Sequence, residues 1–205
     1  MARWEPDARG RLLRTAVDLF CEQGYEATTT AQIAERAGLT KTTLFRLFPD
    51  KREILFQGQD ALIDLAVDAV HRAPVDSPAI GAVGAAIAAM TDAHLPDHAS
   101  SRRLAGLIAA SPELRERAAF KRSSITAALA TALLEHLGSP RRAGLVADIG
   151  VRAYYDGFDA WIAADDERSL TEVTLDELAN CEADLREIIA RSERVPFLSE
   201  PDAGH

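Results

Sequence analysis

Five neighbouring side chains carry groups that suit a nucleic acid. They are Lys41, Thr42, Thr43, Phe45 and Arg46. Ammonium, guanidinium and hydroxyl groups hydrogen-bond to phosphate oxygens and base edges, and an aromatic ring packs against a sugar or a thymine methyl. The other residues of this segment, Leu44 and Leu47, are apolar. We therefore expect a short helix that buries its leucines and presents the polar side chains outward.

Two short helices joined by a tight turn are predicted around this segment. Thr29 and Gln32 form a capping-box pattern, so the first helix should begin directly after Thr29. Gly38 suits the left-handed backbone that often ends a helix. Thr40 can cap the second helix, which is expected over residues 41–47.

A longer helix should follow the pair. Pro49 ends the second short helix, and Asp50 with Glu53 repeats the capping-box pattern. The apolar spacing then predicts one continuous helix from Lys51 to about His71.

The apolar positions of the two short helices predict how they pack. The residues expected in a shared core are Ile33, Ala37, Leu39, Leu44 and Leu47. Ala34 lies where the helices cross, and its small side chain lets them approach. This is the helix-turn-helix arrangement, in which the second helix enters the major groove of DNA. An ordinary helical hairpin with a polar face is the alternative.

On these residues the stretch resembles the N-terminal domain of the TetR (tetracycline repressor) family of transcriptional regulators. The matching residues are Gly24-Tyr25, Thr28-Thr29, Ile33-Ala34, Ala37-Gly38-Leu39-Thr40-Lys41, Thr43-Leu44-Phe45 and Phe48-Pro49-Asp50-Lys51. The resemblance includes the preceding helix, and beyond residue 60 it is architectural only.

The resemblance implies DNA contacts for eight residues, and Arg46 is added because it lies on the same exposed helix face. By position, the phosphate-binding and backbone-clamping residues are Thr28, Thr29, Thr30, Thr43, Phe45 and Lys51. The positions that meet base edges are Lys41 and Thr42, with Arg46 beside them. Lys51 would contact a phosphate together with the N-terminus of its own helix.

Three positions depart from the family pattern. Phe45 replaces a common Tyr, which removes a hydroxyl-to-phosphate bond. Leu47 replaces a common His, and Ala31 stands where some members have a base-reading Arg. Sequence reading is therefore expected to depend mainly on the second helix, through Thr42 and its two cations.

The charge of the chain is unevenly distributed. Its 205 residues carry a formal net charge of −9. Residues 1–52 contain nine Lys or Arg and seven Asp or Glu, which gives +2, so residues 53–205, with 14 basic and 25 acidic residues, carry −11. An acidic remainder should repel DNA and confine binding to the N-terminal part.

Several classes of function lack support in the sequence. There is no Gly-rich phosphate loop, nucleophile elbow or cysteine cluster, so we predict a protein that is not an enzyme, with no catalytic residues and no cofactor. His94 and His98 have a metal-ligand spacing, but Pro96 interrupts their helix, and no metal is predicted. No apolar run is long enough for a membrane span, and residues 1–6 lack the apolar core of a signal peptide.

An all-α fold with two domains is expected. The predicted division is a helix-turn-helix DNA-binding domain at 1–52, a helical-bundle ligand-binding and dimerisation domain at 53–195, and a flexible tail at 196–205. Helices are predicted over about 7–23, 30–37, 41–47, 51–71, 78–94, 100–110, 112–137, 140–164 and 174–192. A capping box of Thr174 with Glu177 marks the start of the last one. The isolated thiols Cys21 and Cys181 indicate a cytoplasmic protein with mostly buried cysteines.

The last two long helices, about 140–164 and 174–192, carry apolar faces. Leu178, Cys181, Leu185 and Ile188 follow a three-four-three spacing like that of a coiled-coil seam. On the helix before, Gly150 and Gly157 lie seven apart and allow close helix approach. In the TetR family these helices form the dimer interface, so a homodimer is expected; packing within one subunit is the alternative.

Together these features predict a homodimeric, ligand-responsive repressor that binds a near-palindromic double-stranded operator and is released by a small molecule. The effector is not identified. Candidate walls for its pocket are Met90, Leu107, Ile108, Phe120, Ile125, Tyr154, Phe158 and Trp161. Two other classes remain open: a helical small-molecule binder or enzyme, and a DNA-architectural dimer without a ligand.

Overall fold

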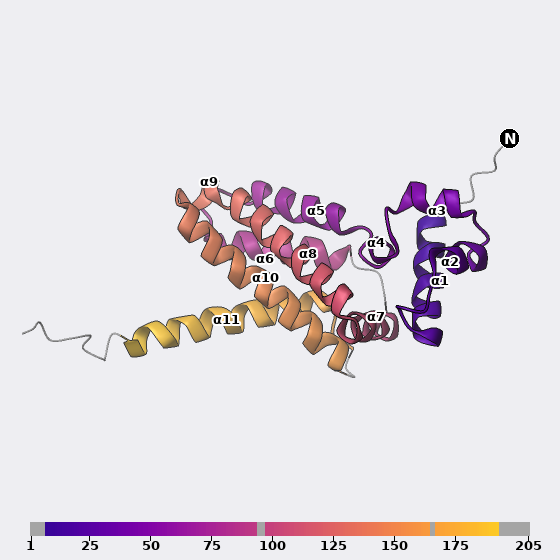
Figure 1. Cartoon of the computed structure of the whole chain (residues 1–205). Helices are drawn as coiled ribbons and strands as arrows, with labels where there is room; N and C mark the ends of the chain where they lie inside the picture. The colour runs from indigo at the N-terminus through magenta and orange to yellow at the C-terminus, as the bar shows by residue number, and fades with distance from the viewer. Residues whose placement is uncertain (1–6, 94–96, 165–166, 193–205) are drawn as a thin grey trace, which may run out of the picture.

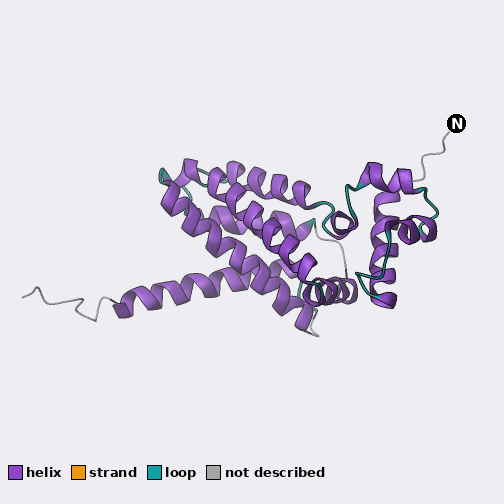
Figure 2. Cartoon of the chain, in the orientation of Figure 1, coloured by secondary structure: helices purple, strands orange, loops and turns teal. Residues whose placement is uncertain are grey.

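The computed structural model describes residues 7–93, 97–164 and 167–192, and within these ranges all regular secondary structure is α-helical (Figures 1 and 2). The all-α prediction is therefore confirmed. The predicted tail at 196–205, the N-terminal residues 1–6 and His94 lie outside the described residues.

An N-terminal module contains four helices. They are α1 (Ala8–Gln23), α2 (Thr30–Arg36), α3 (Lys41–Leu47) and α4 (Lys51–Leu55). Ile33, Ala34 and Leu44 are at most 2% exposed and join Leu12, Phe20 and other residues of α1 and α4 in one apolar core. Leu39 and Leu47 pack partly buried against the same core. The predicted packing of the two short helices is thus confirmed.

The predicted single helix from Lys51 to about His71 is wrong. The structure has two helices there, α4 and α5 (Gln59–Arg72), separated by Phe56, Gln57 and Gly58. Gly58 has φ 81°, a left-handed conformation that ends the helical path and that glycine adopts at little cost. Phe56 packs against the core of the module, whereas α5 places Ala66 and Val70 in the core of the second domain. The chain therefore turns where it passes from one core to the other.

The second domain contains the remaining helices. After α5 they are α6 (Ala79–Asp92), α7 (His98–Ala110), α8 (Pro112–Ala132), α9 (Leu134–Leu137), α10 (Pro140–Ala163) and α11 (Leu170–Ser192). The helix predicted over 112–137 is divided at Leu133, which is fully buried and whose amide binds the carbonyls of Leu129 and Thr131. The residues after this point, Leu134–Leu137, form the separate short helix α9.

Helix α11 begins four residues before the predicted start at Thr174. Ser169 and Glu172 form the capping box: the Glu172 amide donates to Ser169 Oγ at 3.2 Å, and the Ser169 amide donates to Glu172 Oε2 at 2.8 Å. Thr174 is instead inside the helix, fully buried, and its hydroxyl donates to the Leu170 carbonyl at 2.7 Å. Because Thr and Ser can both cap a helix, sequence spacing alone did not separate the two starts.

The two glycines of α10 do permit close helix approach, and they do so within this chain. A Cβ added to Gly150 would lie 2.3 Å from Val83 Cγ1 on α6. A Cβ added to Gly157 would lie 2.7 Å from the Cα of Thr174 on α11. Helix α10 is therefore pressed against α6 at one point and against the backbone of α11 at another.

The module and the second domain meet through α7 and the beginning of α8 (Figure 1). Leu114 of α8 is fully buried in the core of the module, and Leu104, Leu107 and Ile108 of α7 pack against that core. The boundary predicted between residues 52 and 53 falls inside α4, whose Ile54 and Leu55 belong to the module core. On the opposite side of the bundle, α11 extends beyond its neighbours.

Candidate DNA interface

The turn between α2 and α3 is formed by the residues that predicted it. The Gln32 amide donates to Thr29 Oγ1 at 3.2 Å, and the Thr29 amide donates to Gln32 Oε1 at 2.8 Å, which completes the capping box. Gly38 has φ 69°, and the Thr43 amide donates to Thr40 Oγ1 at 3.1 Å. Both helix starts are thus fixed by local hydrogen bonds, so the direction of α3 is set by the sequence of the turn itself.

Helix α3 presents a polar outer face. Lys41, Thr42 and Arg46 are exposed, and Phe45 is 46% exposed, while Leu44 on the opposite side is fully buried. The Lys41 ammonium lies 5.7 Å from the centre of the Phe45 ring, within the range of a cation–π contact. The outer face therefore combines two cations, a hydroxyl and an aromatic ring on a helix whose inner face is firmly packed.

The three threonines at the start of α2 differ in position. Thr29 is exposed and Thr30, the first residue of α2, is half-buried. Thr28 is only 1% exposed; its hydroxyl donates to the Gly24 carbonyl at 2.8 Å and accepts from Gln23 Nε2 at 3.1 Å. The side chain of Thr28 is therefore part of the module's interior, and the hydroxyl-to-phosphate contact predicted for it does not fit this geometry.

Two further predicted contact residues already have partners. The Thr43 hydroxyl lies 2.9 Å from that of Thr40. The Lys51 ammonium donates to the carbonyls of Tyr25 at 2.8 Å and Thr28 at 3.4 Å, and it lies 4.0 Å from the centre of the Tyr25 ring. Since an ammonium has three N–H groups, two carbonyls leave one for a phosphate.

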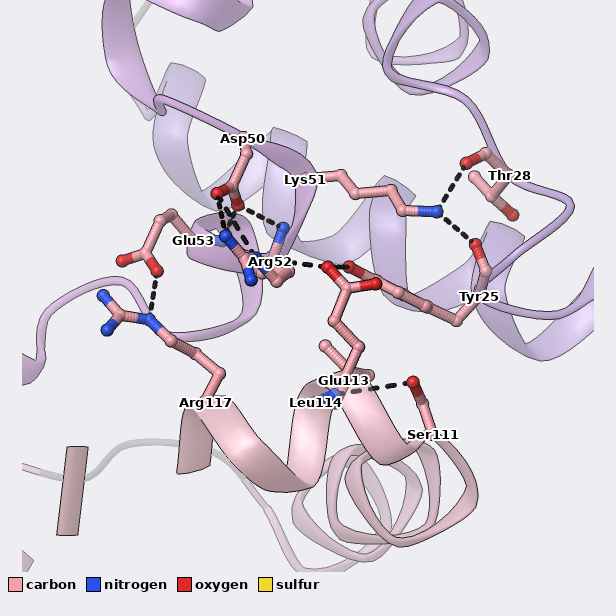
Figure 3. A network of polar contacts seen from close by, with 10 residues as sticks. All are labelled: Tyr25, Thr28, Asp50, Lys51, Arg52, Glu53, Ser111, Glu113, Leu114 and Arg117. Carbon is pink, nitrogen blue, oxygen red and sulfur yellow. Dashed lines mark hydrogen bonds and ion pairs between the residues drawn. The ribbon is translucent and has the colours of Figure 1, made fainter. Parts of the chain in front are cut away.

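The start of α4 is capped by one carboxylate. Asp50 Oδ1 accepts from the amides of Arg52 at 2.8 Å and Glu53 at 3.1 Å. Burial raises the pKa of Asp50, but the hydrogen bonds from Arg52 and from these amides outweigh it and hold the pKa below its usual value. The reciprocal half of the predicted capping box is not formed, because the Glu53 carboxylate points to α8 instead (Figure 3).

Sequence reasoning missed a set of charged residues where the module meets α8, which we call the interdomain cluster. Its members are Tyr25, Arg52, Glu53, Glu113 and Arg117, which Figure 3 shows, together with Lys121. The Tyr25 hydroxyl donates to Glu113 Oε1 at 3.2 Å, and Arg52 Nε lies 3.2 Å from the same oxygen. Burial, and then the nearby Glu113 carboxylate, raise the pKa of Tyr25, so its hydroxyl remains a donor.

The arginines of α1 are mostly occupied within the module. Arg14 pairs with Asp7 at 3.1 Å, and the Arg9 guanidinium lies 5.0 Å from the centre of the Phe48 ring. Cys21 is exposed, so the expectation that it is buried was wrong, and Cys181 is half-buried. Across the described ranges, no group of three or more His, Cys, Asp and Glu side chains could hold a metal ion.

These features define a helix-turn-helix module joined to a helical bundle, and comparisons with known proteins match the module to a family. Residues 12–57 match the family model of bacterial regulatory proteins of the tetR family. An uncharacterized HTH-type transcriptional regulator of Mycobacterium tuberculosis is 32% identical over 92 residues, covering 45% of this chain and 47% of the relative. TcmR, an HTH-type transcriptional regulator of Streptomyces glaucescens, is 34% identical over 82 residues, covering 40% and 36%.

Solved structures extend the likeness to the whole fold. A TetR transcriptional regulator from Nitrosomonas europaea superposes with a TM-score of 0.56 at 16% identity, covering 87% of this chain and 98% of that one. A TetR-family regulator from Mesorhizobium loti gives 0.54 at 18%, covering 88% and 96%. The family match is therefore confined to the N-terminal module, and the solved structures show that the whole chain shares the fold of TetR-family regulators. The chain spans about half the length of the curated relatives in sequence.

The lengths and hydropathies of the helices in the described part of the chain bear on membrane insertion. None of its helices is both long enough and apolar enough to cross a bilayer.

Proposed function

We propose that this chain is a transcriptional regulator that binds a near-palindromic DNA operator as a homodimer and releases it when a small molecule enters the second domain. The observation that carries the proposal is the outer face of α3. Helix α3 is held in place by the buried side chain of Leu44 and by the Thr40 cap at its N-terminus. Its exposed face carries Lys41, Thr42, Phe45 and Arg46. A rigid helix with this face suits the major groove.

The residues divide into two roles. Lys41, Thr42 and Arg46 are the candidates for base-edge contacts, because their polar ends are exposed along one face of α3. The backbone contacts are assigned to Thr29, Thr30, Thr43, Phe45 and Lys51. Thr28 is left out, because its hydroxyl donates to the Gly24 carbonyl and its amide donates to the Tyr25 carbonyl. Phosphate contacts position the protein without reading sequence, whereas base contacts specify it.

A homodimer is supported by α11. The seam predicted on this helix divides into two parts: Leu178 is buried in the chain's own core, whereas Leu185 and Ile188 are 38% and 60% exposed. Ile189 is 59% exposed, and Leu145 on α10 is 57% exposed. The second half of α11 extends past the bundle (Figure 1). Apolar residues in such a position are typical of an interface, and a second copy would present two α3 helices to paired half-sites.

The charge distribution favours the proposed orientation. The second domain carries most of the negative charge of a chain whose net charge is −9, whereas residues 1–52 are weakly positive. Electrostatic attraction therefore directs α3 and not the bundle toward the polyanion. A regulator of this kind acts on the chromosome, so we place it in the cytoplasm.

Release by a small molecule requires that the ligand favour a conformation that does not fit DNA. Of the residues proposed to line its pocket, Met90, Ile125 and Tyr154 are buried in the second domain. Phe120 is 61% exposed, and Leu107 and Ile108 pack toward the module, so these three are poor candidates for the pocket wall. Burial raises the pKa of Tyr154 to about 12, so it would offer a neutral hydroxyl to a ligand.

Selection of DNA by the protein tests the proposal directly. Wild-type protein is used to select duplexes from a random-sequence library, and retained duplexes are measured in gel-shift assays at two salt concentrations. We expect a near-palindromic consensus whose retention falls as salt rises. Lys41→Ala and Thr42→Ala should change the preferred bases, with Arg72→Ala, a cation on α5, as the control. Failure to retain any preferred sequence would leave the helical small-molecule binder as the better description.

A further inference from the structure

Two buried polar atoms near the start of α7 have no hydrogen-bond partner among the described residues. They are His98 Nε2 and Ser101 Oγ. Ser101 is 2% exposed and His98 is half-buried. The two residues are three positions apart, so their side chains lie on one face of the helix. A buried polar atom without a partner lowers stability, so two of them side by side indicate a group that is still to be bound.

Ser101 differs from hydroxyl-bearing residues elsewhere in the helices. Six of those donate to the carbonyl four residues earlier: Thr91, Ser123, Ser124, Thr126, Thr131 and Thr174. The corresponding carbonyl for Ser101 is that of Asp97, which accepts the Ser101 amide at 3.0 Å but not the hydroxyl. A buried hydroxyl that does not bind its own helix is available to a group from outside the helix.

Aromatic rings lie beside these atoms. Trp161 of α10 is 7% exposed, and its ring centre lies 3.9 Å from that of His98 and 6.2 Å from that of Phe158. Trp161 belongs to a small apolar cluster of α10 and α11 that is separate from the two larger cores. Its indole N–H already donates to the Arg168 carbonyl at 3.1 Å. The indole therefore offers its flat faces, and the polar atoms come from α7.

The polar atoms of α7 favour a neutral hydroxyl as their partner. A serine hydroxyl both donates and accepts, and a neutral imidazole nitrogen donates or accepts according to its tautomer. A ligand hydroxyl, which also does both, satisfies Ser101 and His98 with either tautomer. The Asp97 carboxylate caps the same helix end, where it accepts from the Ser100 amide at 2.8 Å, so it would repel a carboxylate on the ligand.

A third buried nitrogen shows why the pairing of the two atoms matters. His136 Nδ1 also has no partner among the described residues, but the same ring contacts the Val70 carbonyl through Nε2 at 3.2 Å. The orientation of that ring is therefore explained by its other nitrogen. His98 and Ser101 instead place two unpartnered atoms within one helical turn, beside aromatic walls.

His98 is the part of this region that a ligand can displace. The residue is half-buried, and rotation about two side-chain bonds moves its ring off the indole of Trp161. A flat aromatic ring can then pack against Trp161 in an offset-stacked or edge-to-face arrangement. Its hydroxyl would meet Ser101 one turn farther along α7, with His98 beside it.

We propose that the start of α7 and the end of α10 bind a neutral aromatic alcohol. Ser101 and His98 bind its hydroxyl, and Trp161 and Phe158 contact its ring. This inference rests on the proposed function for the role of the alcohol as the effector, whereas binding itself is measured without DNA.

Thermal unfolding of the ligand-free chain tests whether the Ser101 hydroxyl is unpartnered. Ser101→Ala removes it, and Ser124→Ala on α8 is the control, because it has the same gain in helix propensity but loses a bond of 3.1 Å to the Phe120 carbonyl. At one fixed protein concentration, Ser101→Ala should have a Tm about 2–4 °C above that of Ser124→Ala. A Tm at or below that of the control would show that Ser101 has a structural partner and would overturn the proposal.

Binding is tested with 2-naphthol and with 2-methylnaphthalene, which replaces the hydroxyl by a methyl group of similar size. The indole N–H signal of Trp161 is followed by NMR, and Trp4→Phe distinguishes it from the second indole of the chain. We expect 2-naphthol to shift this signal and to bind about tenfold more tightly than 2-methylnaphthalene. Ser101→Ala and His98→Phe should remove this preference, whereas Ser124→Ala should keep it.

The outcomes separate the site from the proposed function. If 2-naphthol leaves the Trp161 signal unchanged, or if Ser101→Ala keeps the preference for the alcohol, the site is refuted whether or not the chain binds DNA. If the site binds 2-naphthol but the wild type selects no duplex, the proposed function fails and the site stands. Where both hold, 2-naphthol should release the selected duplex from the wild type but not from Ser101→Ala. Equal release from both would refute the role of this site in regulation.

Discussion

The N-terminal module and the second domain are built in different ways. Polar groups fix the module: Thr29, Thr40 and Asp50 cap its helices, and the buried Thr28 hydroxyl ties α1 to the turn that follows it. Small residues fix the second domain, where α10 has glycine at its contacts with α6 and α11. In the module, specific hydrogen bonds orient short helices. In the second domain, long helices pack by approaching closely at glycine.

The solvent-exposed surfaces of the two domains also differ, one being polar and the other apolar. The module exposes the polar face of α3, and the second domain exposes Leu185, Ile188 and Ile189 on α11. A polar, cationic helix attracts a polyanion, whereas apolar side chains gain free energy only when another apolar surface covers them. The difference indicates that the module and α11 bind partners of different chemistry, and each half of this comparison can be tested separately.

The largest effect is expected for the double substitution Leu185→Glu and Ile188→Glu. A homodimer would bury four of these side chains, each contributing about 1 kcal/mol because it is already partly covered, so the dimer dissociation constant should rise about a thousandfold. Operator affinity should fall with it, because one α3 helix reads only a half-site. Sedimentation velocity over a range of protein concentrations measures the first effect, and gel shift measures the second.

Val75→Glu is the control for added charge. Val75 is 63% exposed in the loop after α5, outside the proposed α11 interface, so the substitution should leave the assembly unchanged. If the α11 double variant sediments as the wild type does, the interface lies elsewhere and the comparison of the two open surfaces is wrong.

The next effect concerns how the second domain is packed. Gly157→Ala places a methyl group 2.7 Å from the Cα of Thr174, and a backbone atom cannot move aside cheaply. The free energy of unfolding should fall by about 2 kcal/mol. Gly144→Ala on the same helix meets no atom within 4 Å and should instead raise it by about 0.5–1 kcal/mol. Urea unfolding at one fixed protein concentration measures both; equal effects would contradict the close approach.

The corresponding stability test in the module is Thr28→Val, which keeps the shape of the side chain and removes its hydroxyl. The lost bonds to Gly24 and Gln23 should lower the free energy of unfolding by about 1–2 kcal/mol. The operator affinity of the folded protein should be unchanged, because this side chain lies inside the module. Thr42→Val should show the opposite pattern, with stability within about 0.5 kcal/mol of wild type and altered base preference. If Thr28→Val loses operator affinity while remaining folded, the Thr28 hydroxyl contacts a phosphate after all.

The features that could be predicted from sequence are those set by neighbouring residues. The Thr29–Gln32 capping box, the Thr40 cap and the left-handed Gly38 each depend on groups within a few positions, and all three are present. The same local reasoning did not distinguish Thr28 from Thr29, because either threonine could cap a helix and only the folded chain shows that the Thr28 hydroxyl turns inward to Gly24 and Gln23.

The features that could not be predicted depend on distant segments. Glu53 has the spacing of a capping-box residue, yet its partner is Arg117, which lies 64 positions away. The break between α4 and α5 follows from Phe56 packing into the module while α5 packs into the bundle. Hydrophobic periodicity reports which residues are apolar but not which of two cores they join, and only the folded chain answers that question.

A smaller effect is expected for Lys51→Ala, which concerns the polar surface of the module. Loss of one phosphate contact should lower the slope of log affinity against log salt by about one and weaken all sequences similarly. Arg72→Ala removes an exposed cation of the second domain and should leave the slope unchanged. If Lys51→Ala lowers stability but not the slope, the ammonium serves only the carbonyls of Tyr25 and Thr28, and the phosphate assignment is wrong.

The smallest effect, and the only gain of affinity, is expected for Phe45→Tyr. The ring is 46% exposed on the outer face of α3, so an added hydroxyl would extend toward the DNA backbone and donate to a phosphate oxygen. The Lys41 ammonium would keep its contact with the ring, since Tyr and Phe both bind cations on their faces. Operator affinity should rise by roughly threefold to tenfold, with the base preference unchanged. Phe120→Tyr adds the same hydroxyl to an exposed ring of α8 and should have no effect; a gain in both variants would show that the hydroxyl does not act at the DNA surface.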